Sequence, residues 1–368
     1  MKKTEPSLFK LQVVICLLPA LFLYACKKDS TTPSVKAVVN ATPFTLGLYE
    51  YANGSNKRIF IPITQIGTQT VNYGAIFDTG SPGMTMDATG IIPAAMITTA
   101  GIQFTGDSTV VNGITVTSKT AVISYGDATG ITKEYGNLAY ANVTIGNSLG
   151  NAVLKRVPFF LYYKIIDSDG KQLEAHAADV FGVSPGTSNT RSEILSPLRY
   201  YTFGTGLTNG FKLATLNTGS FNSTATYVSN LLTIGLTSAD LSSSGFIMHT
   251  LINYTNGGYS PNIPGTITYG NTTIAAQFLF DTGTPSVTVI ENKLATNALG
   301  QLPANTQVTL TTDQGFTYTY STTSTGNLTE IQNPNNTQDF RTVLSIDFFL
   351  KNEYLTDYGN HKIGLKNN

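Results

Sequence analysis

The chain has almost no cysteine, no tryptophan and few charges. Its 368 residues include 2 Cys, 3 His and no Trp, and only 12% of them are charged. Both cysteines, Cys16 and Cys26, lie near the amino end, so the rest of the chain cannot carry a disulfide framework or a cysteine-ligated metal. The histidines, His176, His249 and His361, are far apart and form no zinc-ligand pattern. We therefore expect no metal and no other cofactor.

Neither sign of charge is in excess. The 22 Lys and Arg residues balance 22 Asp and Glu residues. Because such a chain has no global positive field to hold a polyanion, we expect no nucleic-acid partner. A hydrophobic fraction of 41% is enough to build a core. The length suits one large all-β unit or two domains.

The first 25 residues have the pattern of a signal peptide. Lys2, Lys3 and Lys10 precede an apolar run over residues 11–23, which is short for a membrane span and is interrupted by Pro19. This pattern predicts export of the chain, with residues 1–25 removed.

The next residues resemble a lipid-attachment site. Leu23-Tyr24-Ala25-Cys26 is similar to a bacterial lipobox, whose cysteine is acylated and becomes the first residue. An ordinary signal peptide followed by a chance cysteine is the alternative. Residues 26–42 are polar without a periodic apolar face, so we expect a lipidated Cys26 and a flexible tether. Lys27 rather than Asp follows the cysteine, which favours the outer over the inner membrane of a bacterial envelope.

The body of the chain is typical of antiparallel β-structure. Alternating runs of β-branched and aromatic residues have a period of two, and Gly, Asn and Asp clusters between them indicate tight turns. Helical periodicity is convincing only over residues 192–201 and 346–351. Typical runs are 58–63, 114–117, 142–145, 266–269 and 308–311, and the turn signals are Asn53-Gly54, Asn112-Gly113, Asp169-Gly170, Asn256-Gly257-Gly258 and Tyr269-Gly270-Asn271.

One motif occurs twice. Phe77-Asp78-Thr79-Gly80-Ser81 recurs as Phe280-Asp281-Thr282-Gly283-Thr284, and each copy follows an apolar strand and precedes an alternating one. A single Asp-Thr-Gly is usually a turn, but two copies in the same context predict two lobes of similar topology. Each lobe would present one aspartate from a tight turn.

With both motifs, the sequence resembles the pepsin-like aspartic proteases over nearly the whole body. Residues 123–130 look like the flap hairpin of that family, and 179–184 look like the segment that threads beneath the first aspartate loop. Residues 343–365 are similar to its closing helix and last strands. The resemblance implies an all-β, bilobal pepsin-like fold, with an amino-terminal lobe over 43–210 and a carboxyl-terminal lobe over 211–368.

The resemblance also implies the site. Asp78 and Asp281 would be the catalytic pair, sharing one proton because two like charges about 3 Å apart cannot both ionise. The residues supporting the pair would be Thr79, Gly80, Ser81, Thr282, Gly283 and Thr284, and the flap residues over an extended peptide would be Tyr125, Gly126 and Asp127. The sequence departs from the family at Pro82, Pro285 and Ser345, and in lacking the Trp that normally supports the flap tyrosine.

Three functions stay open on sequence alone. The first is an aspartic endopeptidase tethered to a bacterial envelope, a monomer that cleaves peptides or proteins. The second is a catalytically silent, peptide-binding lipoprotein on the same fold. The third is an unrelated β-rich surface adhesin, which does not explain the paired motifs.

Overall fold

A computed structural model describes residues 42–127, 130–187, 191–254, 258–295 and 300–368. These residues belong to one compact unit, Val39–Asn368. The predicted signal peptide and tether, with Cys26, lie outside the described residues. The predicted all-β class is confirmed, because the described residues form two large sheets and only short helices.

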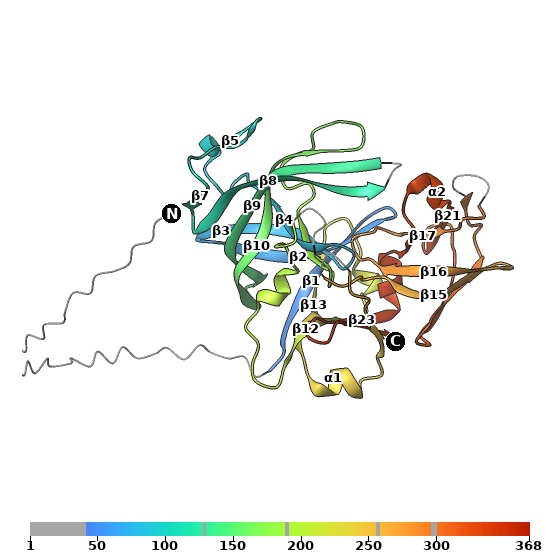
Figure 1. Ribbon diagram of the computed structural model, residues 1–368. Coiled ribbons are helices and arrows are strands. Elements are labelled where there is room, and N and C mark those ends of the chain that lie inside the picture. Colours follow the sequence, from blue (N-terminus) through green and yellow to red (C-terminus); the bar gives the residue numbers. More distant parts are fainter. Residues whose placement is uncertain (1–41, 128–129, 188–190, 255–257, 296–299) are drawn as a thin grey trace, which may run out of the picture. The chain divides into compact units, whose positions relative to one another are not determined.

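The larger sheet has 14 strands and contains both early and late parts of the chain (Figure 1). Its order is β14-β24-β23-β12-β13-β1-β2-β3-β11-β4-β10-β9-β8-β7. The strands are β1 (Phe44–Asn53), β2 (Asn56–Ile66), β3 (Gln69–Asp78), β4 (Pro82–Asp87), β7 (Ser108–Val111), β8 (Ile114–Asp127), β9 (Gly130–Asn147), β10 (Gly150–Ile166), β11 (Val180–Val183), β12 (Thr208–Leu213), β13 (Thr226–Leu236), β14 (Ile247–Thr250), β23 (Asn352–Asp357) and β24 (Lys362–Asn367).

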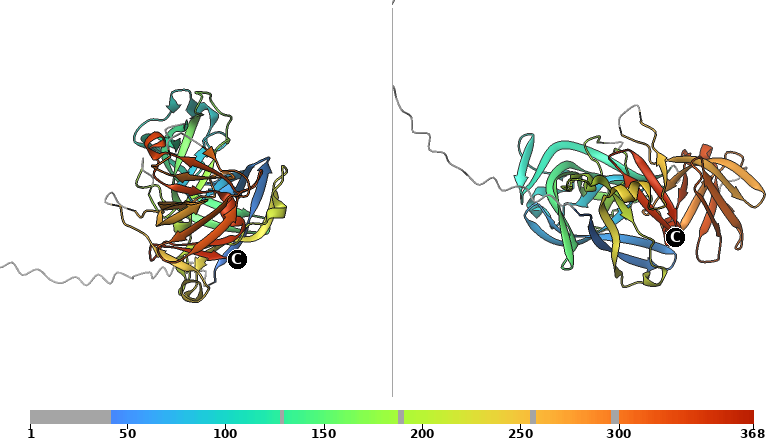
Figure 2. Two further views of the ribbon diagram at one scale, coloured as in Figure 1. Left: turned by 90° about the vertical axis from the view of Figure 1, so that its right-hand side faces the viewer. Right: turned by 90° about the horizontal axis from the view of Figure 1, so that it is seen from below.

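The smaller sheet has 8 strands, all drawn from residues 263–344. Its order is β18-β21-β17-β22-β16-β15-β19-β20. The strands are β15 (Ile263–Tyr269), β16 (Thr272–Phe280), β17 (Val287–Glu291), β18 (Gly300–Gln301), β19 (Gln307–Thr312), β20 (Thr317–Ser321), β21 (Leu328–Gln332) and β22 (Thr342–Leu344). β5 (Ile97–Thr98) and β6 (Gly101–Ile102) pair separately. The views in Figure 2 show the smaller sheet as an orange and red lobe beside the blue and green strands.

The described helices are all short. They are α1 (Ser238–Ser242), α2 (Pro334–Thr337) and the 3-10 helices η1 (Ala94–Met96), η2 (Pro197–Tyr200), η3 (Thr218–Ser220) and η4 (Ile346–Leu350). The helix predicted over 192–201 is therefore shorter than expected, because Pro197 starts it and disfavours helical geometry in the residue before it. The segment predicted over 346–351 forms η4. None of the helices in the described ranges is long and apolar enough to cross a membrane.

Turn chemistry closes the hairpins where the sequence predicts it. Asn112 and Gly113 connect β7 to β8 with φ of 51° and 69°, the left-handed pair that a two-residue hairpin turn requires. Gly54 and Gly270 likewise have positive φ in the turns after β1 and β15. The turn predicted at 256–258 lies mostly outside the described residues.

The same crossing of strands occurs once in each sheet. In the larger sheet β11 runs parallel to β3 and antiparallel to β4, with Gly182 opposite Asp78. In the smaller sheet β22 runs parallel to β16 and antiparallel to β17. The Asp281 N–H donates to Leu344 O at 2.9 Å. Each crossing positions one Asp-Thr-Gly loop, because the loop follows directly from β3 or β16.

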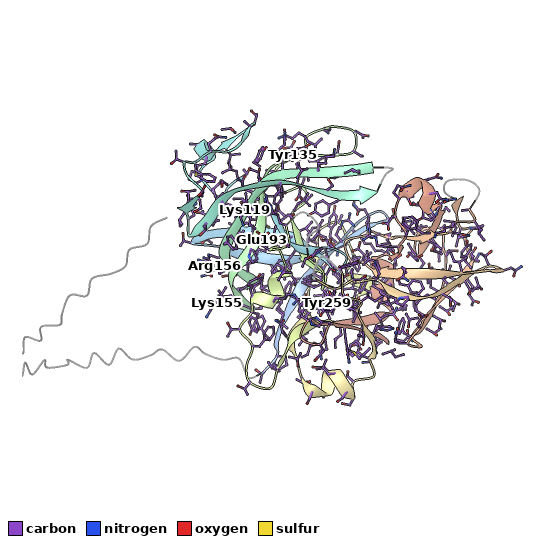
Figure 3. All side chains as sticks on the ribbon, viewed as in Figure 1. Lys119, Tyr135, Lys155, Arg156, Glu193 and Tyr259 are labelled. Carbon is purple, nitrogen blue, oxygen red and sulfur yellow. The ribbon has the colours of Figure 1, made fainter. Side chains whose placement is uncertain are left out.

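A continuous apolar core lies beneath both sheets. Phe77, Phe181 and Phe211 pack together, with ring centroids 6.4 and 5.7 Å from Phe77. In the smaller sheet Phe280 lies 4.5 Å from Phe348. The surface pairs are weaker contributors: the ion pair Lys119–Glu193, labelled in Figure 3, joins two exposed side chains at 2.9 Å and is worth at most about 1 kcal/mol.

A buried polar cluster fastens the end of β4 to the start of β11. The Asp179 carboxylate accepts from the Asp87 N–H and the Tyr162 hydroxyl, both at 2.8 Å, and pairs with His176 Nδ1 at 2.7 Å. His176 Nε2 lies 2.8 Å from Thr89 O. Although burial opposes the charged form, the Asp179 bond and charge raise the pKa of His176. A protonated His176 donates from both ring nitrogens, so it joins its own segment, which includes Asp179, to Thr89.

We expect the fold to lose stability as pH rises from about 5 to about 8. Burial raises the pKa of Glu50 to about 7 and also raises that of Glu134. These carboxyls and His176 hold protons more tightly in the folded chain. The stability that the carboxyls contribute is lost as pH rises above their unfolded pKa of 4.5, and for Glu50 this loss ends near pH 7. The stability that His176 contributes is lost as pH rises above its unfolded pKa of 6.5. The Glu50 shift alone corresponds to about 3 kcal/mol.

Denaturant unfolding at a series of pH values measures this slope. Glu50→Gln should flatten it below pH 7, because an amide has no proton to lose. Glu193→Gln is the matched control, since Glu193 is exposed and its pKa is lowered. A wild-type slope of zero, or an equal change in both variants, would contradict the assignment.

Candidate active site

The two Asp-Thr-Gly loops meet back to back. The Thr79 N–H donates to Thr282 Oγ1 at 3.1 Å, and the Thr282 N–H donates to Thr79 Oγ1 at 3.0 Å. Each hydroxyl in turn donates across to the other loop, Thr79 to Phe280 O at 2.7 Å and Thr282 to Phe77 O at 2.5 Å. Both threonines are at most 1% exposed. This exchange of four hydrogen bonds holds two segments 203 residues apart in one orientation.

The aspartates that precede these threonines face each other. Their carboxyls lie within hydrogen-bond contact. The approach is so close that a Cβ on Gly80 would lie 2.4 Å from Asp281 Cγ, and one on Gly283 would lie 2.6 Å from Asp78 Cγ. Both glycines are therefore required by space rather than by a positive φ.

Each carboxyl is held by its own loop. Asp78 Oδ1 accepts from the Gly80 and Ser81 N–H groups at 2.7 and 3.0 Å, and Ser81 Oγ donates to Oδ2 at 2.5 Å. Asp281 Oδ1 accepts from the Gly283 N–H at 2.7 Å, and Thr284 Oγ1 donates to Oδ2 at 2.6 Å. One oxygen of each carboxyl thus accepts from a hydroxyl, and the other accepts from backbone N–H groups of its own loop.

The electrostatics favour one shared proton. Burial is the main cause that raises the pKa of Asp78, followed by the negative charge of Asp281 and the hydrogen bond to it, while the Ser81 bonds act in the opposite direction. Two carboxyls in contact cannot both ionise at low cost, so the pair titrates as a unit.

The pair lies on a cavity of about 740 Å³. Gly80, Ser81, Gly283 and Thr284 line this cavity with the aspartates, whereas the buried Thr79 and Thr282 lie beneath it. The rest of the lining comes from strands of both sheets and from the loops between them: Pro82, Thr85, Ile123, Ser124, Tyr125, Gly126, Gly130, Ser184, Gly186, Thr187, Ile194, Tyr254, Pro261, Asn262, Leu279, Val289, Glu291, Gln332, Asp339, Arg341 and Val343.

The β8–β9 hairpin supplies Tyr125 and Gly126 to the cavity wall. Gly126 has a φ of 107°, and a Cβ there would lie 2.0 Å from Gly130 O, so the bend in the hairpin needs glycine. Asp127 closes the hairpin by pairing with Gly130. The predicted flap is therefore formed as a hairpin, and its residues 128–129 lie outside the described ranges.

The flap tyrosine has a support that the sequence did not reveal. Its hydroxyl donates to Thr85 Oγ1 at 3.4 Å, and Thr85 donates to Glu134 Oε1 at 3.2 Å. Burial raises the pKa of both Tyr125 and Glu134. The sequence does contain one sign of this support: Glu134 lies at an inward position of β9, opposite Ile123, where a charged residue is unusual.

Ser345 occupies the position in the smaller sheet that corresponds to Gly182 in the larger sheet. At the matching position in the larger sheet, a Cβ on Gly182 would lie 2.5 Å from both Gly83 O and Ser81 O. Ser345 instead is fully buried, its N–H donates to Thr288 Oγ1 at 3.3 Å, and its hydroxyl lies 3.4 Å from the same oxygen. Thr288 therefore provides a polar partner for both the backbone N–H and the hydroxyl of Ser345.

The chain folds like solved structures to which its sequence is barely similar. An aspartic proteinase from Irpex lacteus superposes with a TM-score of 0.54 over 89% of this chain and 97% of its own, at 15% identity. The fold is pepsin-like and bilobal. The predicted fold is thereby confirmed.

Two globulins share this pepsin-like fold. Basic 7S globulin from soybean matches with a TM-score of 0.54 at 11% identity, over 88% of this chain and 96% of its own. Conglutin gamma, a basic 7S globulin from lupine seeds, matches with the same TM-score at 12% identity, over 89% and 96%. No protein-family model and no curated protein sequence matches the chain. Because the pepsin-like fold is shared by a proteinase and by globulins, function has to be argued from the site.

Proposed function

We propose that this protein is an aspartic endopeptidase. The observation that carries the proposal is the contact between Asp78 and Asp281 on the cavity, with one hydroxyl bonded to each carboxyl. With one proton between them, the ionised carboxyl takes a proton from a water molecule that attacks the peptide carbonyl, and the protonated carboxyl donates to the carbonyl oxygen. The amine then leaves with a proton from the pair, without a covalent intermediate.

The substrate of the proposed enzyme is a peptide or protein in extended form. The lining of the cavity includes residues of the β8–β9 hairpin and residues of the smaller sheet, and Gly126 and Gly283 offer backbone at its walls. An extended chain binds such backbone as an added strand. Tyr125 lines the same cavity as Asp78, where its ring would exclude water from the reacting bond. We expect the enzyme to act as a monomer.

The direct test is proteolysis by the purified full chain. A denatured protein substrate is incubated from about pH 3 to about pH 7, a range that includes the acidic pH at which an aspartate pair shares one proton, with and without a peptidic transition-state inhibitor. Inhibitor-sensitive cleavage supports the proposal. Tight binding of the inhibitor without cleavage at any pH would support the silent peptide-binding protein instead.

Thr284→Ala is expected to move the pH optimum upward. The Thr284 hydroxyl bonds Asp281 Oδ2 at 2.6 Å, and a hydrogen bond to the ionised form favours ionisation. Its loss makes the pair hold its last proton to higher pH. Rate against pH measures the shift, and an unmoved optimum would remove the role given to this hydroxyl. Thr319→Ala, an exposed threonine on β20, should leave the optimum unchanged.

We further propose that lipid attached to Cys26 anchors the protein in a bacterial envelope, at the outer membrane. Leu23-Tyr24-Ala25-Cys26 and the following Lys27 motivate this proposal. Cys26→Ser should release the protein from the membrane fraction, because it removes the attachment point of the buried acyl chains that would form the anchor. Cys16→Ser is the matched control. Unchanged fractionation of Cys26→Ser would exclude lipidation as the anchor.

A further inference from the structure

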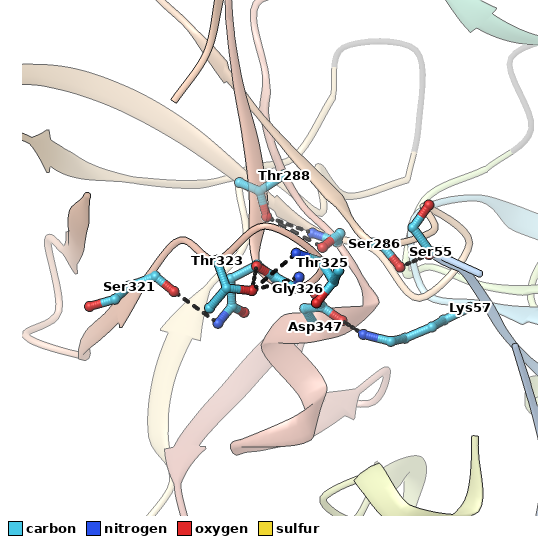
Figure 4. Close-up of polar contacts among 11 residues, drawn as sticks. Ser55, Lys57, Ser286, Thr288, Ser321, Thr323, Thr325, Gly326 and Asp347 are labelled. Carbon is cyan, nitrogen blue, oxygen red and sulfur yellow. Dashed lines mark hydrogen bonds and ion pairs between the residues drawn. The ribbon is translucent and has the colours of Figure 1, made fainter. Parts of the chain in front are cut away.

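The hairpin of β1 and β2 reaches the second aspartate loop. Figure 4 shows Ser55 and Lys57 from this hairpin beside Ser286 and Asp347. Ser286 Oγ donates to Ser55 O, and Lys57 Nζ lies 2.5 Å from Asp347 Oδ1. Asp347 is 3% exposed, so the ion pair is largely removed from water. The hairpin therefore contacts the loop that follows Asp281 and the helix η4.

Arg58, the next residue of β2, extends this contact to the aspartate loop itself. Its Nη1 donates to Gly283 O at 2.9 Å. Gly283 is the residue whose N–H binds Asp281 Oδ1 and whose Cα packs against the Asp78 carboxyl. The guanidinium thus holds a backbone group that touches both carboxyls, and it comes from a strand that contains neither.

Arg58 also has a charge suited to the pair. Among the described residues, the groups whose pKa is shifted by the charge of Asp78 or Asp281 include Arg58 from β2, Tyr125 from β8, Arg341 before β22 and Tyr354 from β23. Arg341 gives both arms of its guanidinium to Asp339, at 2.8 and 2.7 Å, so a neighbouring negative charge offsets its own. The bond of Arg58 is to a neutral carbonyl, and its charge acts on the aspartates without that offset.

We propose that Arg58 is a positioning residue of the Asp78–Asp281 pair, which fixes the Gly283 carbonyl and by its charge favours ionisation of the pair. Burial lowers the pKa of Arg58, while both aspartates oppose that effect, and the guanidinium stays protonated because arginine starts far above neutral pH. A nearby cation stabilises every ionised state, so both titration steps of the pair move to lower pH. The pH range with one proton therefore also moves to lower pH.

The effect of Arg58 on catalysis rests on the proposed function, but its effect on the titration of the aspartates can be measured without any turnover. Carbon-13 NMR of chains labelled at the aspartate carboxyl carbon follows the titration of Asp78 and Asp281, assigned by the signals lost in Asp78→Asn and Asp281→Asn. In Arg58→Gln and Arg58→Met both steps should move up by about one pH unit. If turnover exists, its pH profile should move by the same amount.

Matched variants separate charge from structure. Lys57→Gln removes the same charge one residue away and loosens the same hairpin, but should leave the titration of the pair in place. Arg58→Lys keeps the charge and should titrate near the wild type. Unmoved steps in Arg58→Gln, or equal shifts in Lys57→Gln, would overturn the proposal.

Two further outcomes are decisive. If both neutral variants fail to fold, Arg58→Lys decides: steps near those of the wild type support the role of charge, and steps raised by the full amount contradict it. If no variant and no wild-type chain cleaves any substrate, the endopeptidase proposal fails while the titration still tests Arg58.

Discussion

Asp78→Asn and Asp281→Asn are each expected to abolish turnover and to leave the fold intact. Each change removes one of two proton-transfer roles, and positioned acid and base groups contribute about 10²–10⁴-fold apiece. Because both roles are needed in one step, we expect a fall in kcat of at least about 10⁴-fold, near the limit of detection. The Asn side chain has the same shape as Asp: its one oxygen can still accept the backbone N–H bonds, and its amide nitrogen can donate to the Ser81 or Thr284 hydroxyl.

The double variant distinguishes a pair from two independent groups. Removing both carboxyls should cost little more than removing one, since the remaining aspartate cannot act alone. Activity is measured with the same substrate and inhibitor, and folding by circular dichroism and thermal unfolding. Asp313→Asn, in the loop after β19, is the control. Wild-type turnover in either single variant would assign the chemistry to another group.

Thr79→Val is expected to destabilise the protein by about 2–6 kcal/mol, because it leaves two buried groups without their partners. The Thr79 hydroxyl donates to Phe280 O and accepts from the Thr282 N–H. Valine has nearly the same volume but offers neither bond. Since these bonds orient both aspartate loops, kcat should fall in the fraction that remains folded.

Denaturant unfolding measures the loss, with two comparisons. Thr79→Ser keeps the hydroxyl and should cost much less than Thr79→Val. Thr319→Val removes an exposed hydroxyl that pairs only with Thr309 at 2.9 Å, and should change stability by no more than about 0.5 kcal/mol. Equal losses of unfolding free energy in Thr79→Val and Thr319→Val would show that the hydrogen bonds between the two aspartate loops do not stabilise the fold.

The family resemblance named the residues around the aspartates, but it did not predict how Thr79 and Thr282 are bonded. Thr79 and Thr282 bond across the two loops, and Ser81 and Thr284 bond the carboxyls. The lobe boundary at 210/211 stays a prediction, and the larger sheet takes strands from both sides of it, since β13, β23 and β24 lie in the same sheet as β1.

The sequence by itself determined the β class, most hairpin turns and the two aspartate loops. These features depend on neighbouring residues: the alternation that makes a strand, the positive φ that Asn112 and Gly113 accept, and the short Asp-Thr-Gly turn. Only the tertiary structure decided which distant groups meet. Arg58 reaches Gly283 across 225 residues, and Thr85 bonds Glu134 across 49. Nothing in the local pattern of a strand specifies such a partner, because the contact arises from how whole sheets pack around one cavity.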